Sequence, residues 1–131
     1  MDIYYAHAMC IYGTDDEEIE INHIKINFPE LKIVDPGSYA NNPQKRKEGM
    51  EYCKKLVTNC DALVFTRLLG KITSGVGIEI HHALSQNKPV YELENGKVKI
   101  IKTPPKYISR EETIALYLDW YMKKIHTRNQ T

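Results

Sequence analysis

The stretch Lys71-Ile-Thr-Ser-Gly-Val-Gly-Ile-Glu-Ile-His-His-Ala-Leu84 combines two hydroxyls, two glycines and a carboxylate within a few residues. The segment before it, residues 62–66, reads Ala-Leu-Val-Phe-Thr, a short apolar run that predicts a buried strand. After the glycines, Ile80, Ala83 and Leu84 recur at helical spacing. The stretch therefore predicts a junction between a strand and a helix.

Gly75 and Gly77 at the start of this helix would let the backbone approach a ligand closely. The unpaired N–H groups of a first helical turn, together with the helix dipole, favour an anion such as phosphate. Glu79 follows about one turn later, where the dipole favours the charged carboxylate and hence a nucleophile over a general acid. Glycines and a glutamate at such a junction also occur for packing reasons alone, so the local pattern leaves both interpretations open.

The composition is that of an ordinary globular protein and predicts one domain over residues 1–131. The chain is 42% hydrophobic and 27% charged, with a formal net charge of +1. Its one basic run, Lys45-Arg46-Lys47, predicts a solvated helix start, so duplex nucleic acid is not an expected partner. No apolar run has the length of a membrane span and no basic leader precedes Asp2, which favours a cytoplasmic protein without a membrane partner.

The cysteines and histidines do not indicate a metal site. The chain has an odd number of cysteines and no CxxC pair, which argues against a disulfide framework and against a zinc site. The three are Cys10, Cys53 and Cys60. His81 and His82 lack a third ligand at suitable spacing. The acidic residues of the Thr14-Asp-Asp-Glu17 capping box are expected to form a solvated first turn. We therefore expect neither a metal nor another cofactor.

Apolar strands alternate with helical patterns along the chain. Asn95-Gly96 predicts a type I′ hairpin, and Ser109-Arg-Glu-Glu112 predicts a capping box that opens a closing helix. The apolar stripe of that helix could face the domain or a second subunit. Strands are predicted at 2–6, 31–34, 62–66, 89–93 and 98–101, and helices after Thr14, over 44–59, after Gly75 and after Ser109, with Ile114, Leu118, Tyr121 and Ile125 forming the stripe of the last.

This alternation predicts a single-domain α/β fold with a doubly wound, mainly parallel sheet, Rossmann-like or flavodoxin-like, a C-terminal antiparallel edge hairpin and a closing helix. Ligands of such sheets bind beyond the carboxyl ends of the strands. Segments 5–13, 35–42 and 66–77 all follow strand ends and should converge there. Asp61 begins its strand, so it should lie at the opposite edge as a turn residue.

Three motifs in combination resemble the nucleoside 2-deoxyribosyltransferase superfamily, which includes the 2′-deoxynucleoside 5′-phosphate N-hydrolases. They are Ile3-Tyr-Tyr-Ala6, Asp35-Pro36 and Gly75-Val-Gly-Ile-Glu-Ile-His-His-Ala83, within a likeness over residues 2–93. The resemblance implies cleavage of an N-glycosidic bond through a sugar bound to Glu79. It implies that Tyr4 orients this carboxylate, and that Thr73, with Ser74 beside it, lies near a 5′-phosphate.

The chain departs from the family pattern at the general acid. The hydrolase branch has an acidic residue in the helix before the third strand, and spacing places Cys53 there. Glu51 and Glu48 are the nearest carboxylates, and Asp35 is a third candidate. We take Glu51 as the catalytic candidate and leave the assignment open.

Further candidates for substrate binding follow strand ends. His7 stands where the family more often has a small residue, which indicates a binding role, an altered specificity or no role. Gly13 closes the same loop. Arg67 could contact a phosphate or pair with an acidic neighbour. With Asp35, Thr73, Ser74, Gly75 and Gly77, these residues form the predicted substrate site.

The sequence thus predicts an enzyme that cleaves or transfers the base of a (deoxy)nucleoside or nucleoside 5′-monophosphate. The alternatives are a non-catalytic nucleotide-binding or sensing module with the same pocket, and a dimeric scaffold with a vestigial cleft. By the resemblance, neighbouring subunits often complete the pocket, so we expect a homodimer or larger homo-oligomer.

Overall fold

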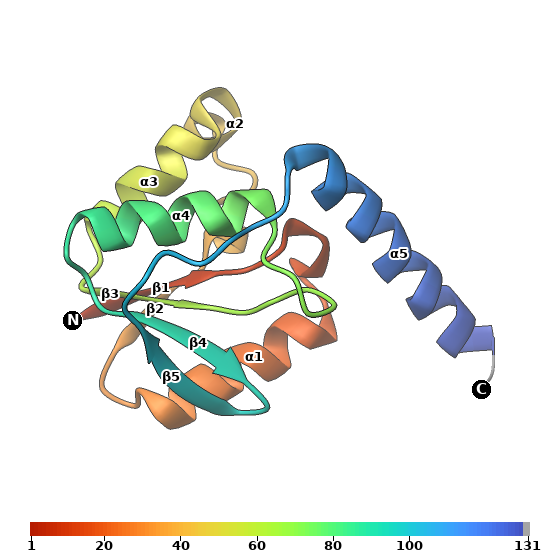
Figure 1. The fold of residues 1–131 in the computed structure, drawn as a ribbon, viewed down its shortest axis with the longest axis horizontal. Helices are drawn as coiled ribbons and strands as arrows, with labels where there is room; N and C mark the ends of the chain where they lie inside the picture. Colours follow the sequence, from red (N-terminus) through yellow and green to blue (C-terminus); the bar gives the residue numbers. More distant parts are fainter. Residues whose placement is uncertain (130–131) are drawn as a thin grey trace.

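The computed structural model describes residues 1–129, so the last two residues of the predicted 1–131 domain lie outside the described residues. Strands and helices follow one another in the predicted alternation (Figure 1). The elements are β1 (Asp2–Ala6), the 3₁₀ helix η1 (Met9–Ile11), α1 (Asp15–Asn27), β2 (Lys32–Val34), the 3₁₀ helix η2 (Pro36–Tyr39), α2 (Pro43–Glu48), α3 (Met50–Thr58), β3 (Ala62–Phe65), α4 (Ser74–Ser85), β4 (Val90–Glu94), β5 (Lys97–Ile101) and α5 (Arg110–Asn129).

The five strands form one sheet in the order β2-β1-β3-β4-β5. The first four strands are parallel, and β5 returns antiparallel to β4 at the edge. This is the predicted α/β fold, with the strand order of flavodoxin-like sheets, in which a ligand crevice forms where the order reverses, between β1 and β3. Asp61 lies at the opposite edge as predicted, where its Oδ2 accepts a hydrogen bond from the Asp2 N–H at 2.8 Å.

Helices cover both faces of the sheet, α3 and α4 on one and α1 on the other (Figure 1). Side chains of a strand alternate between these faces. On β1, Tyr4 and Ala6 are buried in the core beneath α3 and α4, whereas Ile3 and Tyr5 are buried with Ile24 of α1. The alternation places two successive tyrosines in two different cores, and it decides which helix each hydroxyl can reach.

The predicted helix 44–59 is wrong in one respect, because the chain forms two helices that meet at Gly49. Gly49 has a φ of 57° and a ψ of −118°, a conformation that residues with a side chain rarely adopt. The apolar spacing begins only after this glycine, and it correctly predicts that Cys53 and Val57 are buried by α3. Helix α2 buries none of its residues, so no core contact holds it in line with α3.

Local turn chemistry is as predicted. Thr14 Oγ1 accepts a hydrogen bond from the Glu17 N–H at 3.4 Å at the start of α1. Ser109 and Glu112 form a reciprocal capping box, with N–H to side-chain distances of 3.1 and 3.2 Å. Residues 95 and 96 both have positive φ, 53° and 77°, as the type I′ hairpin requires.

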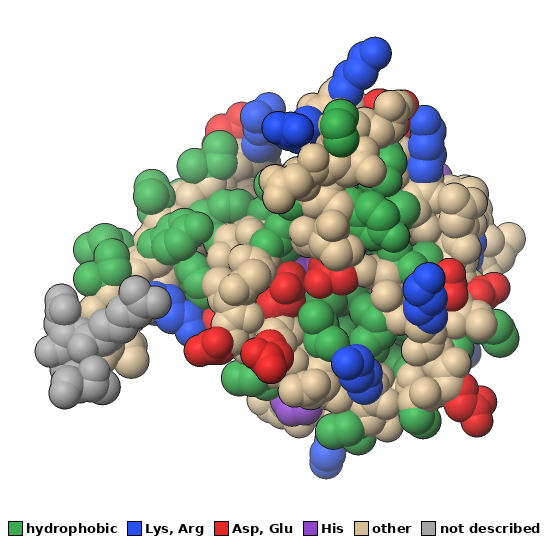
Figure 2. Space-filling view, turned by 180° about the vertical axis from the view of Figure 1, so that it is seen from behind, with side chains coloured by type: hydrophobic (Ala, Val, Ile, Leu, Met, Phe, Trp, Pro, Cys, Tyr) green, Lys and Arg blue, Asp and Glu red, His purple; other side chains and the backbone are tan. Residues whose placement is uncertain are grey.

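Helix α5 is packed on one face near its start and then extends away from the body of the molecule (Figure 1). Leu116 and Trp120 are buried in a small cluster with Ala8, Ile11 and Leu68. The opposite face carries the apolar stripe, whose green side chains run along this helix in Figure 2. Its four predicted members, Ile114, Leu118, Tyr121 and Ile125, are 49–63% exposed.

Within residues 1–129, none of the helices combines the length and the apolar character needed to cross a bilayer.

Candidate active site

A cavity of about 730 Å³ lies beyond the carboxyl ends of β1 and β3, where the strand order reverses. Its volume is typical of sites that bind small molecules. The segment after β1, the break between α2 and α3, and the starts of α4 and α5 contribute to its wall. Its titratable and hydroxyl-bearing lining residues are His7, Tyr12, Lys45, Arg46, Cys53, Thr73, Ser74, Glu79, Arg110, Thr113 and Tyr117.

Glu79 and Tyr4 meet at the wall of this cavity. Strand β1 holds Tyr4 fully buried, and its hydroxyl donates a hydrogen bond to Glu79 Oε2. Glu79 lines the cavity and is itself only 5% exposed. Because the sheet fixes the tyrosine ring, this hydrogen bond holds the carboxylate in one orientation. The structure therefore brings together the two residues that the sequence pairs as nucleophile and orienting partner.

The electrostatics of Glu79 differ from the prediction. Burial raises its pKa from 4.5 to about 7, and the Tyr4 hydrogen bond, the Lys45 charge and a Cys53 hydrogen bond only partly oppose this. The expectation that the helix dipole favours the charged form of this carboxyl is wrong, because burial has the larger effect. Helix α4 begins at Ser74, so Glu79 lies beyond the first turn, where the dipole is weak and desolvation dominates.

The Cys53 thiol occupies the place that the resemblance gives to an acidic residue. It lines the cavity beside Glu79, and burial raises its pKa. The thiol therefore stays protonated at neutral pH and serves as a hydrogen-bond donor to the Glu79 carboxylate. It partly offsets the effect of burial on Glu79 but provides no second carboxylate.

The start of α4 lies in the cavity wall with Thr73, Ser74 and Gly75. The Ser74 N–H donates to Thr113 Oγ1 at 2.9 Å, so helix α5 already occupies one donor of the predicted anion site. The Thr73 hydroxyl caps no N–H group of the helix, which leaves it for a ligand.

Gly77 has a packing role in place of the predicted contact with a ligand. A Cβ built on Gly77 would lie 2.1 Å from Cγ of Tyr107 and 2.5 Å from its Cβ. Gly77 also does not line the cavity. This glycine therefore makes room for the segment that leads from β5 into α5.

Three cations that the sequence left out of the site line the cavity: Lys45, Arg46 and Arg110. Lys45 Nζ donates to the carbonyl of Pro36 at 2.7 Å and lies 5.1 Å from the centre of the Tyr12 ring. The prediction of a solvated basic run holds for Arg46, which is exposed on α2 although it lines the cavity, whereas Lys45 is half-buried. No local signal marked Arg110, because its position depends on where α5 returns across the sheet edge.

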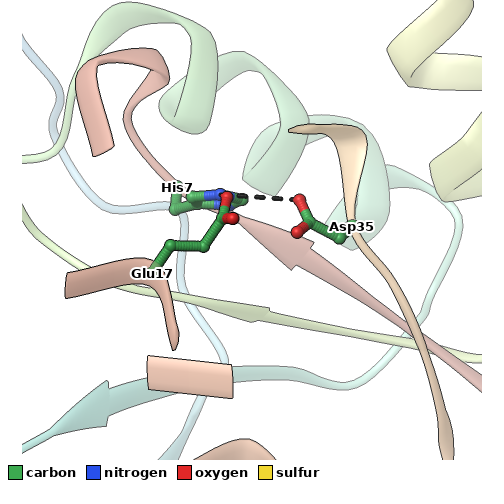
Figure 3. Close-up of side chains that lie close together, drawn as sticks. All are labelled: His7, Glu17 and Asp35. Atoms are coloured by element: carbon green, nitrogen blue, oxygen red, sulfur yellow. Dashed lines mark hydrogen bonds and ion pairs between the residues drawn. The ribbon is translucent and has the colours of Figure 1, made fainter. Parts of the chain in front are cut away.

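His7 is buried in the cavity wall and stacks on Tyr5, with ring centres 3.6 Å apart. Its Nδ1 donates to the Tyr5 carbonyl at 3.0 Å, and its Nε2 lies 2.7 Å from Glu17 Oε2 and 3.6 Å from Asp35 Oδ1 (Figure 3). A carbonyl only accepts hydrogen bonds, so His7 carries a proton on Nδ1. The short contact between His7 Nε2 and Glu17 Oε2 then requires one further proton, carried by either of these two atoms. Burial lowers the pKa of His7 and raises that of Asp35.

Besides Tyr4, which lies behind Glu79, and Gly77, four predicted site residues lie outside the cavity lining. Glu51 is 70% exposed at its side chain and lies 3.5 Å from Lys54 Nζ. Arg67 forms the ion pair that the sequence left open, with its Nε 3.0 Å from Glu92 Oε2. The remaining two are Gly13, whose N–H donates to Glu17 at 3.1 Å, and Asp35, which caps η2.

These placements leave Glu79 as the sole carboxylate among the cavity-lining residues of the described chain. Glu48, the other carboxylate near the predicted acid position, pairs with Lys55 at 2.8 Å. None of the three carboxylates considered as general acid reaches the cavity lining.

A second cavity, of about 670 Å³, lies on the α1 side of the sheet. There the Tyr5 hydroxyl donates to Glu20 Oε1, which also accepts from Thr66 Oγ1 at 2.8 Å. The Arg67–Glu92 ion pair forms another part of its wall. Acidic side chains gather around this hollow, visible as the red group near the centre of Figure 2.

Comparison with known proteins adds no relative to this geometry: no family model matches the chain, and no curated protein matches it.

Proposed function

We propose that this protein cleaves the N-glycosidic bond of a nucleoside or nucleoside 5′-monophosphate, with Glu79 as the nucleophile. The observation that carries the proposal is the carboxylate of Glu79, held by the buried Tyr4 hydroxyl in the wall of a cavity of about 730 Å³. The motifs that resemble the nucleoside 2-deoxyribosyltransferase superfamily give the bond and the roles. Position and hydrogen bonding of the pair are independent of that resemblance.

The reaction proceeds in two displacements. The ionised Glu79 attacks the anomeric carbon, the bond from that carbon to the base nitrogen breaks, and its electron pair leaves with the base, which takes a proton from solvent. Water then attacks the same carbon, releases Glu79 and gives its proton to solvent. A second base in place of water makes the same site a transferase. Solvent serves as the acid in this scheme because Glu79 is the sole carboxylate lining the cavity in the described chain.

A 5′-monophosphate fits the charge of the cavity better than a neutral nucleoside. Arg46 and Arg110 line it and can form paired, charge-assisted hydrogen bonds with phosphate oxygens. The free hydroxyl of Thr73 adds a further donor at the start of α4. With these groups on the phosphate and Glu79 on the sugar, the substrate would be held at both ends.

The second candidate function is a nucleotide-binding module without turnover. One observation favours it: Glu51, Glu48 and Asp35 all lie outside the cavity lining, so no second carboxyl group is placed there to protonate the leaving base. Such a module would retain the Arg46 and Arg110 contacts and use Glu79 only as a hydrogen-bond acceptor.

We further propose that a second copy of the chain covers the exposed stripe of α5. Ile114 belongs both to this stripe and to the cavity lining, so the apolar surface is continuous with the cavity mouth. A two-fold pairing of such helices buries the same stripe on both copies. Light scattering after size-exclusion chromatography should give a dimer for the wild type and a monomer for Leu118→Asp, while Glu111→Gln, an exposed change on the same helix, stays dimeric.

The test of activity is release of free base from a panel of nucleosides and their 5′-monophosphates. Wild type should release base, Glu79→Gln should not, and Glu51→Gln should match wild type because Glu51 is exposed and outside the cavity. Absence of release from every compound, with monophosphates raising the melting temperature of both wild type and Glu79→Gln, would overturn the enzyme proposal and support the binding module.

A further inference from the structure

His7, Glu17 and Asp35 place three metal-ligating atoms together at the carboxyl edge of the sheet (Figure 3). One imidazole nitrogen and one oxygen from each carboxylate lie within 4.8 Å of one another. The residues come from three segments: the end of β1, the first turn of α1 and the turn after β2. Their convergence is a property of the tertiary fold, so spacing along the chain gives no sign of it.

The histidine has the surroundings of a metal ligand. Its Nδ1–H donates to the backbone carbonyl of Tyr5 at 3.0 Å, and stacking on the Tyr5 ring fixes the imidazole plane. Metal-binding histidines generally donate their second ring N–H to a carbonyl or carboxylate in this way, which fixes the tautomer and orients the ligating nitrogen. The other nitrogen, Nε2, faces both carboxylates, and the His7 side chain is fully buried.

Gly37 provides a second, independent observation, because its missing side chain leaves room where the two carboxylates converge. A Cβ at Gly37 would lie 3.0 Å from Asp35 Oδ1 and 3.0 Å from Glu17 Oε2. A substituent here would push against both oxygens at once. The turn after β2 therefore lets the two acidic groups approach one another beside an imidazole.

The distances fit a small cation. Two ligands bound at about 2.1 Å from one ion lie roughly 3.0–3.4 Å apart for angles between 90° and the tetrahedral angle. The distances from His7 Nε2 to Asp35 and Glu17 are 3.6 and 2.7 Å, so shifts of a few tenths of an ångström bring both histidine–carboxylate pairs into this range, while the two carboxylate oxygens lie within 4.8 Å of each other. Without a cation, one histidine alone faces the two carboxylates. The nearby Lys45 ammonium donates its hydrogen bond to the Pro36 carbonyl and not to either carboxylate.

We propose that His7, Glu17 and Asp35 bind a divalent transition-metal ion. One imidazole with two carboxylates is a donor set that suits Zn²⁺, a borderline ion, and that the harder Mn²⁺ also accepts; it disfavours Mg²⁺, which prefers oxygen ligands alone. The ion ties the segment after β1 to the starts of α1 and η2 and so stiffens the wall that presents His7 to the cavity. This site is separate from Glu79 and does not depend on the glycosidic reaction.

Calorimetric titration of chelator-treated protein with ZnCl₂ tests the site, with MnCl₂ and MgCl₂ in parallel. Wild type should bind one Zn²⁺ per chain, Mn²⁺ more weakly and Mg²⁺ not measurably, and Zn²⁺ should raise the melting temperature. Asp35→Asn keeps an oxygen to cap η2 and should weaken Zn²⁺ binding at least about tenfold. His7→Gln should have the same effect.

Two control variants separate this site from adventitious binding. Glu18→Gln changes an exposed acid in the same turn as Glu17, and His82→Gln removes a half-buried histidine on α4; both should bind Zn²⁺ like wild type. Failure of wild type to bind Zn²⁺ would overturn the proposal, as would equal affinity in Asp35→Asn and wild type. In either case the cluster is an ion pair that needs no metal.

Discussion

The two faces of β1 carry the same pair of side chains in two different surroundings. Tyr4 donates to Glu79 on the α4 side, and Tyr5 donates to Glu20 on the α1 side; each glutamate lines a cavity of similar volume. Burial raises the pKa of both carboxyls. A tyrosine bonded to a buried glutamate therefore follows from strand alternation, and by itself it does not identify a catalytic site.

The surroundings distinguish the two pairs. Glu79 is the sole carboxylate in the described lining of its cavity, where three cations accompany it. Glu20 shares its cavity with Asp16, Glu92 and Glu94, and the cation there, Arg67, is already paired with Glu92. An anionic substrate would be attracted to the first cavity and repelled by the second. The comparison therefore favours the α4 face, on charge, as the place of the proposed nucleotide site.

The largest effect should separate the two glutamates. Glu79→Gln and Glu20→Gln are the same isosteric change next to a tyrosine hydroxyl, but only the first removes the proposed nucleophile. We expect base release to fall at least about 10³-fold in Glu79→Gln. Glu20→Gln should change it by less than about threefold, an effect below roughly 0.7 kcal/mol. Comparable losses of base release in both variants would mean that the two tyrosine–glutamate pairs affect activity through protein stability. The two faces of β1 would then not differ in function.

The pH dependence should show the raised pKa of Glu79. The folded carboxyl has a pKa of about 7 against an ordinary 4.5, so between these values the unfolded chain releases a proton that the folded chain keeps. Stability therefore falls as pH rises through this window, by about 3 kcal/mol in total for this group. Urea unfolding at pH 5 and pH 8 should show this loss in wild type relative to Glu79→Gln. Activity has the opposite sign, since the nucleophile must be ionised: kcat/KM should fall about tenfold per pH unit below 7.

The two glycines of α4 test how this helix packs against the segment that precedes α5. Gly77→Ala would place a methyl group against the base of the Tyr107 side chain, so backbone must move, at a cost of about 1–3 kcal/mol in the free energy of unfolding. At Gly75 the nearest atom to a new Cβ is the flexible end of Met50, 3.4 Å away. Gly75→Ala should therefore be neutral or stabilising by about 0.5–1 kcal/mol. Denaturant midpoints check both, and equal effects would show that Tyr107 does not hold α4.

The smallest effect concerns the phosphate. Arg110→Ala should raise KM for a nucleoside 5′-monophosphate about tenfold, since an exposed charged contact contributes about 1.4 kcal/mol, and should leave the matching nucleoside unaffected. The matched control is Arg67→Ala, which removes the cation of the other cavity. If Arg110→Ala raised KM equally for the monophosphate and the nucleoside, the phosphate would bind elsewhere.

Much of the fold was predictable because its signals are local. Short apolar, β-branched runs located the strands, and the capping box at Ser109 and the Asn-Gly pair located the last turns. The rule that ligands lie beyond strand ends then placed the segments 5–13, 35–42 and 66–77 at one edge. The pairing of Tyr4 with Glu79 came from the family resemblance.

The rest of the site depends on geometry that local signals do not carry. Glu51 lies near Cys53 in sequence, but the turn of α3 directs it into solvent. Arg110 reaches the cavity only because the segment after β5 passes over Gly77 before α5 begins. The pKa of Glu79 was misjudged for a related reason, because the depth of burial depends on how three elements close around it.

Under the proposed function, the break at Gly49 has a consequence for how the substrate range can change over evolution. Lys45 and Arg46 lie on a six-residue helix that contributes nothing to the buried core, separated by this glycine from the helix that does. Replacing them should therefore alter which anion is accepted at little cost to folding. A lineage could exchange one phosphorylated substrate for another on this segment while Tyr4 and Glu79 stay fixed in the core.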